Sequence, residues 1–410
     1  MKKFNYLFML FAAATIALTS CGEDEAPDNG VTIEGIPATA TIEAGGTLGP
    51  VTAAATALDG LVSLAITKDG APLATVPLSG TTASAPFSYT ALPADAGKNL
   101  VFEFTVTDTD GDFAKATHVL TVGAEATTIR VTQNITTNTT WETGKTYILG
   151  GRIVVTDGTT LTIQEGVVVK GEVGTGANAT ALIIARGGKL NANGTASAPI
   201  IFTSVADEIE PGQIASPNLD PNISGLWGGV LILGRAPSSF GGDVTEVQIE
   251  GIPASDTNGL YGGTNAEDNS GSIKFISIRH GGANIGEGNE INGLTLGGVG
   301  SGTVIENVEV VANQDDGIEW FGGTVSVKNV LIWNSGDDAI DTDQAWAGTL
   351  DNFIVICGVN TDHSLEIDGP EGTYLAAHTV KNGSVKGHPS SEFADFRAGA
   401  RGTFENLYFF

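Results

Sequence analysis

Basic residues are scarce in this chain, where 19 lysines and arginines stand against 47 aspartates and glutamates. The formal net charge is −28, and so acidic a surface repels nucleic acid and anionic lipid headgroups. It also repels acidic polysaccharides unless cations bridge the two surfaces. The charge therefore argues against nucleic acid as a partner and is typical of a soluble extracellular protein.

Cysteine and helical periodicity are nearly absent as well. The chain has only 2 cysteines, so no disulfide framework is available. Cys357 ends an apolar run and is expected to be a buried core thiol. No stretch beyond the N-terminus reads as a helix of more than about two turns. Glycine, by contrast, occurs 56 times among short runs of Thr, Val, Ile and Asn, which predicts an all-β protein dense in turns.

A repeated pattern occupies the C-terminal part of the chain. Asn307 recurs as Asn329, and Asp316 recurs as Asp338, each at an offset of 22 residues. Looser copies of the pattern start at Thr349, Thr379 and Thr403. A period in the low twenties built from short β-rich runs indicates a solenoid, and the leucine pattern of leucine-rich repeats is missing. The sequence therefore predicts a right-handed parallel β-helix.

Four segments are expected along the chain. Residues 1–20 place two lysines before an apolar stretch that is too short to span a membrane, as in a signal peptide. Residues 21–30 form a short acidic linker. Residues 31–124 alternate strands and turns at roughly ten-residue spacing, which predicts a small β-sandwich. Residues 127–410 form the β-helix.

Several stretches resemble known families. Leu18-Thr19-Ser20-Cys21 resembles the lipobox of bacterial lipoproteins, and Glu23-Asp24-Glu25 resembles the signal that sends lipoproteins of the Bacteroidota to the outer face of the outer membrane. The sandwich looks like an immunoglobulin-like or PKD-type module. Residues 182–204 and 226–234 resemble the N-terminal half of the β-helix lipoproteins of Bacteroidota and marine bacteria, and the resemblance covers roughly Thr146 to the C-terminus. These resemblances imply lipidation of Cys21 and an outer-membrane protein that is lipid-anchored and faces outside.

Acidic residues recur with the repeat. Successive rungs of a β-helix lie about 4.8 Å apart, so residues of equal phase stack. Two carboxylates at that spacing repel by about 0.9 kcal/mol in water and by roughly 3.5 kcal/mol at an effective dielectric constant of ~20. Bound Ca²⁺, raised pKa values or full solvation would each relieve this repulsion. The pattern predicts one column of Asp315, Asp316, Asp337, Asp338 and Asp362, and a second column of Glu319, Asp341 and Glu366.

The ligands expected for Ca²⁺ are Asp316, Asp338, Asp341, Asp362 and Glu366. Solvation on exposed turns is the simpler alternative. In that case Asn313, Asn334 and Asn360 would stack into a purely structural asparagine ladder.

An enzymatic role is the competing interpretation. The run 313–316, Asn-Gln-Asp-Asp, resembles a rung of the polygalacturonases, and paired carboxylates suit general acid–base hydrolysis. The catalytic candidates are then Asp315, Asp316, Asp337 and Asp338. The Gly-His-Gly and Arg-Ile-Lys motifs of that family are missing. In that family an Asn-Thr-Asp rung precedes the Asp-Asp rung, whereas in this chain the run 360–362, Asn-Thr-Asp, follows it. These departures favour a binding protein.

Two polar insertions, residues 205–224 and 252–270, interrupt the period, and insertions in a solenoid often form its binding face. Trp227, Tyr261 and Trp320 either cover the core or form an exposed platform for sugar rings. We therefore predict a binding or adhesion module for a glycan or a surface partner. The alternative is a polysaccharide-active hydrolase or lyase. The aromatic residues near the C-terminus start a rung with an open edge, which predicts self-association.

Overall fold

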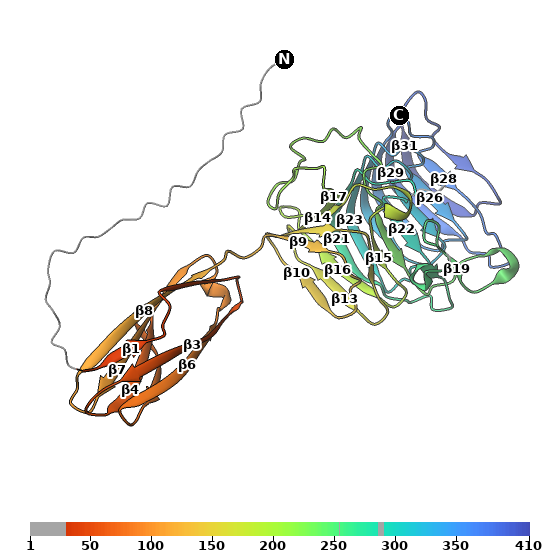
Figure 1. Cartoon of the computed structure of the whole chain (residues 1–410). Helices are drawn as coiled ribbons and strands as arrows, with labels where there is room; N and C mark the ends of the chain where they lie inside the picture. Colours follow the sequence, from red (N-terminus) through yellow and green to blue (C-terminus); the bar gives the residue numbers. More distant parts are fainter. Residues whose placement is uncertain (1–29, 254, 286–290) are drawn as a thin grey trace, which may run out of the picture. The chain divides into compact units, whose positions relative to one another are not determined.

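The computed structural model describes residues 30–253, 255–285 and 291–410, which fall into two compact units that meet between Glu125 and Ala126 (Figure 1). The predicted lipobox and Cys21 lie outside the described residues. Helical structure in the described ranges consists of 3₁₀ turns, namely η1 (Pro93–Asp95), η2 (Gly176–Asn178), η3 (Gly241–Asp243) and η4 (Thr257–Gly259). None of the helices described is long and apolar enough to cross a membrane.

The first unit is an immunoglobulin-like sandwich of two mostly antiparallel sheets, as predicted. One sheet has the strand order β1 (Thr32–Glu34), β3 (Thr47–Thr56), β6 (Thr82–Thr90). The other has the order β2 (Thr39–Ile42), β8 (Phe113–Val122), β7 (Asn99–Asp108), β4 (Leu61–Lys68), β5 (Ala71–Pro77). Alternating residues such as Phe102 and Phe104 of β7 are fully buried, and they pack against Phe87 of the facing sheet.

The second unit is a parallel β-helix, which confirms the predicted fold class. Each rung contributes to a long sheet, here called sheet 1, and to an eight-stranded sheet, here called sheet 2. Sheet 1 contains β9 (Thr128–Val131), β11 (Thr146–Leu149), β14 (Val168–Gly171), β17 (Ile200–Ser204), β21 (Gly271–Arg279), β23 (Val304–Val311), β25 (Val327–Trp333), β27 (Thr349–Ile356), β29 (His378–Lys386) and β31 (Gly402–Phe409), with β10 (Thr139–Trp141), β13 (Thr160–Ile163) and β16 (Lys189–Asn193) joined at β21. Sheet 2 contains β12 (Arg152–Val155), β15 (Ala181–Ile184), β18 (Val230–Leu233), β22 (Leu294–Gly297), β24 (Ile318–Phe321), β26 (Ile340–Asp343), β28 (Leu365–Ile367) and β30 (Asp395–Phe396).

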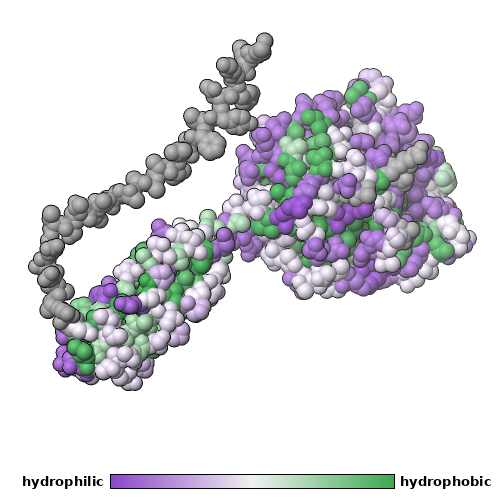
Figure 2. Space-filling view, in the orientation of Figure 1, coloured by the Kyte–Doolittle hydropathy of each residue, from purple (hydrophilic) through white to green (hydrophobic). Residues whose placement is uncertain are grey.

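Apolar residues of equal phase stack inside the β-helix. Ile318, Ile340 and Leu365 are register partners on successive strands of sheet 2, and all three are buried. Because every rung adds one residue to each such stack, the core is a continuous apolar rod. Hydrophilic residues cover much of the face shown in Figure 2, with apolar residues gathered in narrower patches.

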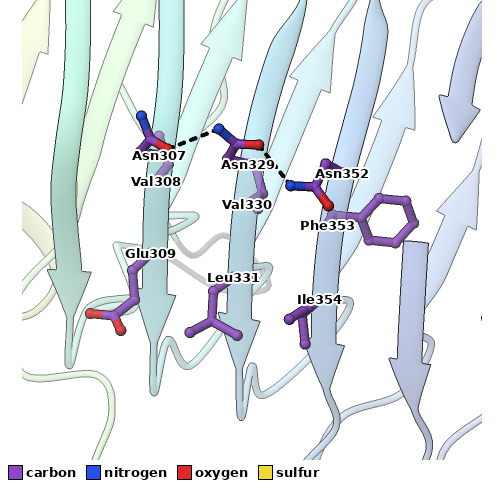
Figure 3. A pocket seen from close by; sticks show the side chains of 9 residues that line it. All are labelled: Asn307, Val308, Glu309, Asn329, Val330, Leu331, Asn352, Phe353 and Ile354. Atoms are coloured by element: carbon purple, nitrogen blue, oxygen red, sulfur yellow. Dashed lines mark hydrogen bonds between the residues drawn. The ribbon is translucent and has the colours of Figure 1, made fainter. Parts of the chain in front are cut away.

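An asparagine ladder runs along sheet 1, where its longer strands bend at residues of positive φ. Asn307, Asn329 and Asn352 have φ values of 60°, 58° and 64°, a conformation that asparagine tolerates better than most residues. The Asn329 amide donates to the Asn307 side-chain oxygen at 2.9 Å, and the Asn352 amide donates to that of Asn329 at 2.7 Å (Figure 3). Further along, the Asn406 amide donates to the Asn382 side-chain oxygen at 2.9 Å, while the Asn382 amide donates to Asp351 at 2.7 Å.

The predicted ladder of Asn313, Asn334 and Asn360 is therefore wrong in its members. Asn313 is buried and donates to the backbone oxygen of Asp316 at 2.8 Å, and Asn334 donates to that of Pro221 at 2.6 Å. The ladder lies within the strands because the bend requires a residue of positive φ, which asparagine tolerates.

Both predicted insertions are loops. One lies where the strands of sheet 2 begin, and the other lies where these strands end. The first, residues 205–229, joins β17 to β18 and contacts Asn334 in the turn before β26. The second, residues 234–270, joins β18 to β21 and includes β19 (Val247–Gln248) and β20 (Leu260–Tyr261). It contacts Gln344 in the turn after β26. Apolar residues of this second loop cover the outer face of the early strands of sheet 2.

The asparagine ladder makes a testable contribution to stability. Asn329→Ala removes two ladder hydrogen bonds and leaves a Cβ residue at positive φ, so we expect a loss of about 2–4 kcal/mol in the free energy of unfolding. Asn329→Gly is the matched control, because it removes the same bonds but accepts the backbone conformation; its loss is expected to be smaller by about 1 kcal/mol. Denaturant unfolding followed by tryptophan emission measures both. Equal losses would show that the bend is unstrained.

Candidate functional site

The candidate site is a column of carboxyl groups on the outer face of sheet 2. Ile318 and Trp320 of β24 point into the core, so Glu319 between them points outward. Glu319 is the register partner of Asp341 on β26, which is in turn the partner of Glu366 on β28. The predicted second column is thus confirmed as a stack. Its members are also buried, at 9% exposure or less, so the simpler expectation of full solvation is wrong.

A second acidic row precedes these strands. The backbone amide of Asp338 donates to the Asp316 carboxylate at 2.9 Å, and the amide of His363 donates to the Asp338 carboxylate at 2.7 Å. His363 therefore takes the position predicted for Asp362, whose side chain is 63% exposed. Counted back from the aligned residues Ile318, Ile340 and Leu365, His363 has the phase of Asp316 and Asp338, whereas Asp362 has the phase of Asp315 and Asp337. Asp315 is only partly buried, and Asp337 is exposed.

Two basic side chains, His363 and Arg397, lie at one end of the site. His363 Nδ1 lies 2.8 Å from Asp338 Oδ1 and 3.4 Å from Glu366 Oε2. Arg397, which follows β30, forms an ion pair with Glu366, and its Nε lies 2.9 Å from Asp368 Oδ1. Nothing in the repeat pattern places Arg397 at the column. The register of β28 with β30 brings it to the column.

The other end of the site carries acidic and amide groups. Asn292 donates from Nδ2 to Glu319 Oε2 at 2.5 Å. Two buried acceptor atoms, Asn292 Oδ1 and Asp341 Oδ1, have no hydrogen-bond partner within the described residues. Such atoms are costly unless a proton or a cation satisfies them. Sequence reasoning missed Asn292, which lies in the connection between β21 and β22, outside the repeat.

Burial shifts the titration of the site. It raises the pKa of Asp316, Glu319 and Asp341 well above the usual range, and repulsion between their negative charges adds to the effect. Burial likewise raises the pKa of Asp343 to about 7. The pKa of Asp338 is raised by burial as well, although its hydrogen bonds with His363 oppose the shift.

A hard divalent cation could replace the protons. One oxygen from each of Asp316, Glu319 and Asp341 lies within 4.8 Å of the others, and Ca²⁺ is bound by carboxylate and amide oxygens. The unpartnered Asn292 Oδ1 adds an acceptor of the same kind. Of the ligands predicted for Ca²⁺, Asp316 and Asp341 belong to this group, while Asp338 and Glu366 group with His363 instead. Asp362 points to solvent.

The aromatic residues predicted as sugar platforms are not exposed. Trp227, Tyr261 and Trp320 are buried, at 0%, 2% and 0% exposure, so this expectation is wrong and the alternative that they cover the core holds. Trp320 stacks on Trp346 at 4.8 Å between ring centroids. Tyr261 lies in the second loop and donates to Gln344 at 2.7 Å.

Fold and site together define a parallel β-helix protein with a buried acidic column on one outer face. Residues 133–409 match the family described as the pectate-lyase like beta helix domain, and the chain belongs to this family. A solved structure, the catalytic unit of a thermostable GH87 alpha-1,3-glucanase from Streptomyces thermodiastaticus strain HF3-3, shares 11% identity with a TM-score of 0.30. The match covers 83% of this chain and 61% of that chain. Among curated protein sequences no match was found.

The raised pKa values predict that acidification stabilises the β-helix. The carboxyl groups hold protons more tightly when folded, so stability is present at low pH and is lost as pH rises through the raised pKa values. Between pH 6.5 and 8.5 we expect the Tm to fall by about 5 °C. Burial lowers the pKa of His280 and His378, which opposes this trend only below about pH 6.5.

Tryptophan emission is the measurement, because all 5 tryptophans lie in the β-helix. Asp316→Asn removes one buried charge and is expected to flatten the pH profile and raise the Tm at pH 8. Asp362→Asn, at an exposed carboxylate of the neighbouring turn, is the matched control and leaves the profile unchanged. A wild-type Tm that rises with pH over this range would contradict the assignment.

We propose that Ca²⁺ relieves the same repulsion when the carboxyl groups are ionised. Millimolar calcium is then expected to raise the Tm at pH 8 by several degrees and to have little effect at pH 6, because protons compete for the ligands. Asp341→Asn is expected to remove the calcium effect, whereas Asp362→Asn retains it. A wild-type melt at pH 8 that changes neither with calcium nor with chelator would leave protonation as the sole compensation.

Proposed function

We propose that this chain is a surface-displayed polysaccharide-active protein that cleaves glycan chains with the carboxyl groups stacked on the outer face of sheet 2. The observation that carries the proposal is the register of Glu319, Asp341 and Glu366 on successive strands. Membership of the pectate-lyase like beta helix family supports a polysaccharide as the substrate class.

The arrangement supplies the two groups that glycoside cleavage requires. Glu366 is held by Arg397 in an ion pair. It serves as the ionised carboxylate, which is the nucleophile in a retaining enzyme. Asp341, on the neighbouring strand, has a buried oxygen with no hydrogen-bond partner in the described part of the chain, and it serves as the proton donor. The raised pKa of Asp341 fits a carboxyl group that keeps its proton at neutral pH. Adjacent strands lie about 4.8 Å apart, close to the ~5–5.5 Å between carboxyl groups of enzymes that retain anomeric configuration.

The two insertions support this location. Residues 205–229 border sheet 2 on the side where its strands begin, through the contact of Pro221 with Asn334. Residues 234–270 border the side where the strands end, through the contacts of Tyr261 with Gln344 and of Gly241 with Glu371. A polymer crossing this face would contact both loops, which is where insertions in a solenoid commonly form binding surfaces.

A second candidate is binding or adhesion without cleavage, toward a glycan or another surface protein. The observation that favours it is the low exposure of the column, since Glu366 is only 5% exposed. The absence of the polygalacturonase motifs from the sequence points the same way.

Cleavage is tested with the purified protein on a panel of neutral and acidic polysaccharides, scored by new reducing ends. Asp341→Asn and Glu366→Gln are each expected to lower the rate at least about hundredfold, as for the loss of a general acid or base. Glu306→Gln, at a surface carboxylate of sheet 1, is the matched control and keeps the activity. The adjacent pair also predicts retention of anomeric configuration. Binding without any new reducing ends would favour the second candidate.

The proposed surface location rests on the lipobox and on the acidic residues that follow it. Cys21→Ala is expected to release the protein from the membrane fraction. Protease added to intact cells is expected to degrade the wild-type protein. Survival on intact cells of a protein that the same protease cuts after purification would contradict display on the outside.

Self-association at the C-terminal rung also remains a proposal. It is supported by exposed aromatic residues there, namely Phe393, Phe396, Tyr408 and Phe410.

A further inference from the structure

A pocket lies on the outer face of sheet 1, away from the acidic column of sheet 2. Its volume is about 390 Å³, within the size range of small-molecule sites. One wall is apolar and comes from the first insertion, including Ile214, Leu219 and Pro221. The floor comes from β21, β23 and β25, where Trp333 and Glu309 are two of the lining residues.

Trp333 differs from every other tryptophan of the chain. The other four are buried, at 2% exposure or less, whereas Trp333 is 40% exposed. The alternation of β25 explains this, because Val330 and Ile332 point into the core and Trp333 points outward. An indole half exposed in a pocket presents an apolar face together with a hydrogen-bond donor.

Arg279 supplies a polar side chain to the lining of the same pocket. Its side chain is 11% exposed, donates to the backbone oxygen of Ile214 at 2.7 Å and lies 3.1 Å from Glu309 Oε2. Arg279 thus ties the first insertion to sheet 1, and its charge is already paired. Glu309 remains 34% exposed and can accept further hydrogen bonds. Burial lowers the pKa of the lining His280, so the histidine adds no positive charge at neutral pH.

A neighbouring pocket of about 320 Å³ extends this surface along the rungs, since Glu309 lines both. Glu309, Leu331 and Ile354 are register partners and form a row beside the asparagine ladder (Figure 3). Ile354 is 49% exposed. The row therefore offers apolar contacts at the spacing of the rungs, with carboxylate and amide groups alongside.

We infer that these pockets form a second glycan-binding site, for uncharged pyranose rings. A sugar ring has an apolar face that packs on Trp333, and hydroxyl groups that donate to Glu309. An acidic sugar would meet the Glu309 carboxylate and a chain of net charge −28, with Arg279 already occupied. The site lies on a different sheet from the proposed catalytic column, and it needs no cleavage to operate.

The test is binding of neutral soluble polysaccharides, namely β-glucan, xylan, mannan and α-glucan, with polygalacturonate as the anionic comparison. Binding is followed by affinity electrophoresis and by tryptophan emission. The measurements use the Asp341→Asn background, in which the proposed cleavage is abolished. At least one neutral polymer is expected to bind and to shift the emission of the exposed Trp333, and polygalacturonate is expected not to bind.

Trp333→Ala is expected to weaken that binding at least tenfold, and Trp333→Phe to retain part of it. Phe113→Ala, at an exposed aromatic residue of the first unit, is the control and binds like the parent. Thermal melts check that each variant is folded. Binding that survives Trp333→Ala, a preference for polygalacturonate, or no binding of any neutral polymer would overturn the inference. None of these results would decide whether the column of sheet 2 cleaves glycans.

Discussion

Parallel pairing between successive rungs places residues of equal phase about 4.8 Å apart, and the other features of the β-helix depend on this constraint. Where the phase is apolar, as at Ile318, Ile340 and Leu365, stacking removes every member from water. Where the phase is amide, as along Asn307, Asn329 and Asn352, each side chain donates to the preceding one. Where it is acidic, the same spacing forces like charges together.

The fold therefore places the carboxyl groups of the acidic column close together, and their electrostatic repulsion must be offset by protons or by positive groups. At one end of the column, Glu366 forms an ion pair with Arg397 and lies 3.4 Å from His363 Nδ1. Away from this end, Asp341 and Asn292 each have a buried oxygen without a hydrogen-bond partner among the described residues. Raised pKa values and cation binding are two solutions to one electrostatic problem. Both would also equip the column for work on a substrate, which links the proposed function to the repeat itself.

The periodicity of the sequence predicted much of the fold and part of the candidate site. The stack of Glu319, Asp341 and Glu366 was predictable because these acids recur at the same phase of the repeat. Asp362 was assigned to the wrong position because the residue three before Glu366, which has the phase of Asp316 and Asp338, is His363. The ladder asparagines carried a usable signal, since asparagine is disfavoured within strands yet recurs there. The positions of Arg397 and Asn292 in the site could not be predicted from the sequence. Arg397 reaches the column only through the pairing of β30 with β28, and Asn292 lies outside the repeat.

The 22-residue period has an evolutionary corollary. Duplication of one period inserts a whole rung and lengthens every stack at once, without disturbing the register of the others. Apolar and asparagine stacks gain stability with each copy, so selection for stability alone would let the solenoid grow. The acidic stack gains an uncompensated charge with each copy unless an arginine, a histidine or a ligand arrives with it. A duplicated rung is thus tolerated most easily after its acidic position has mutated, which restricts the column to a short stretch of the solenoid.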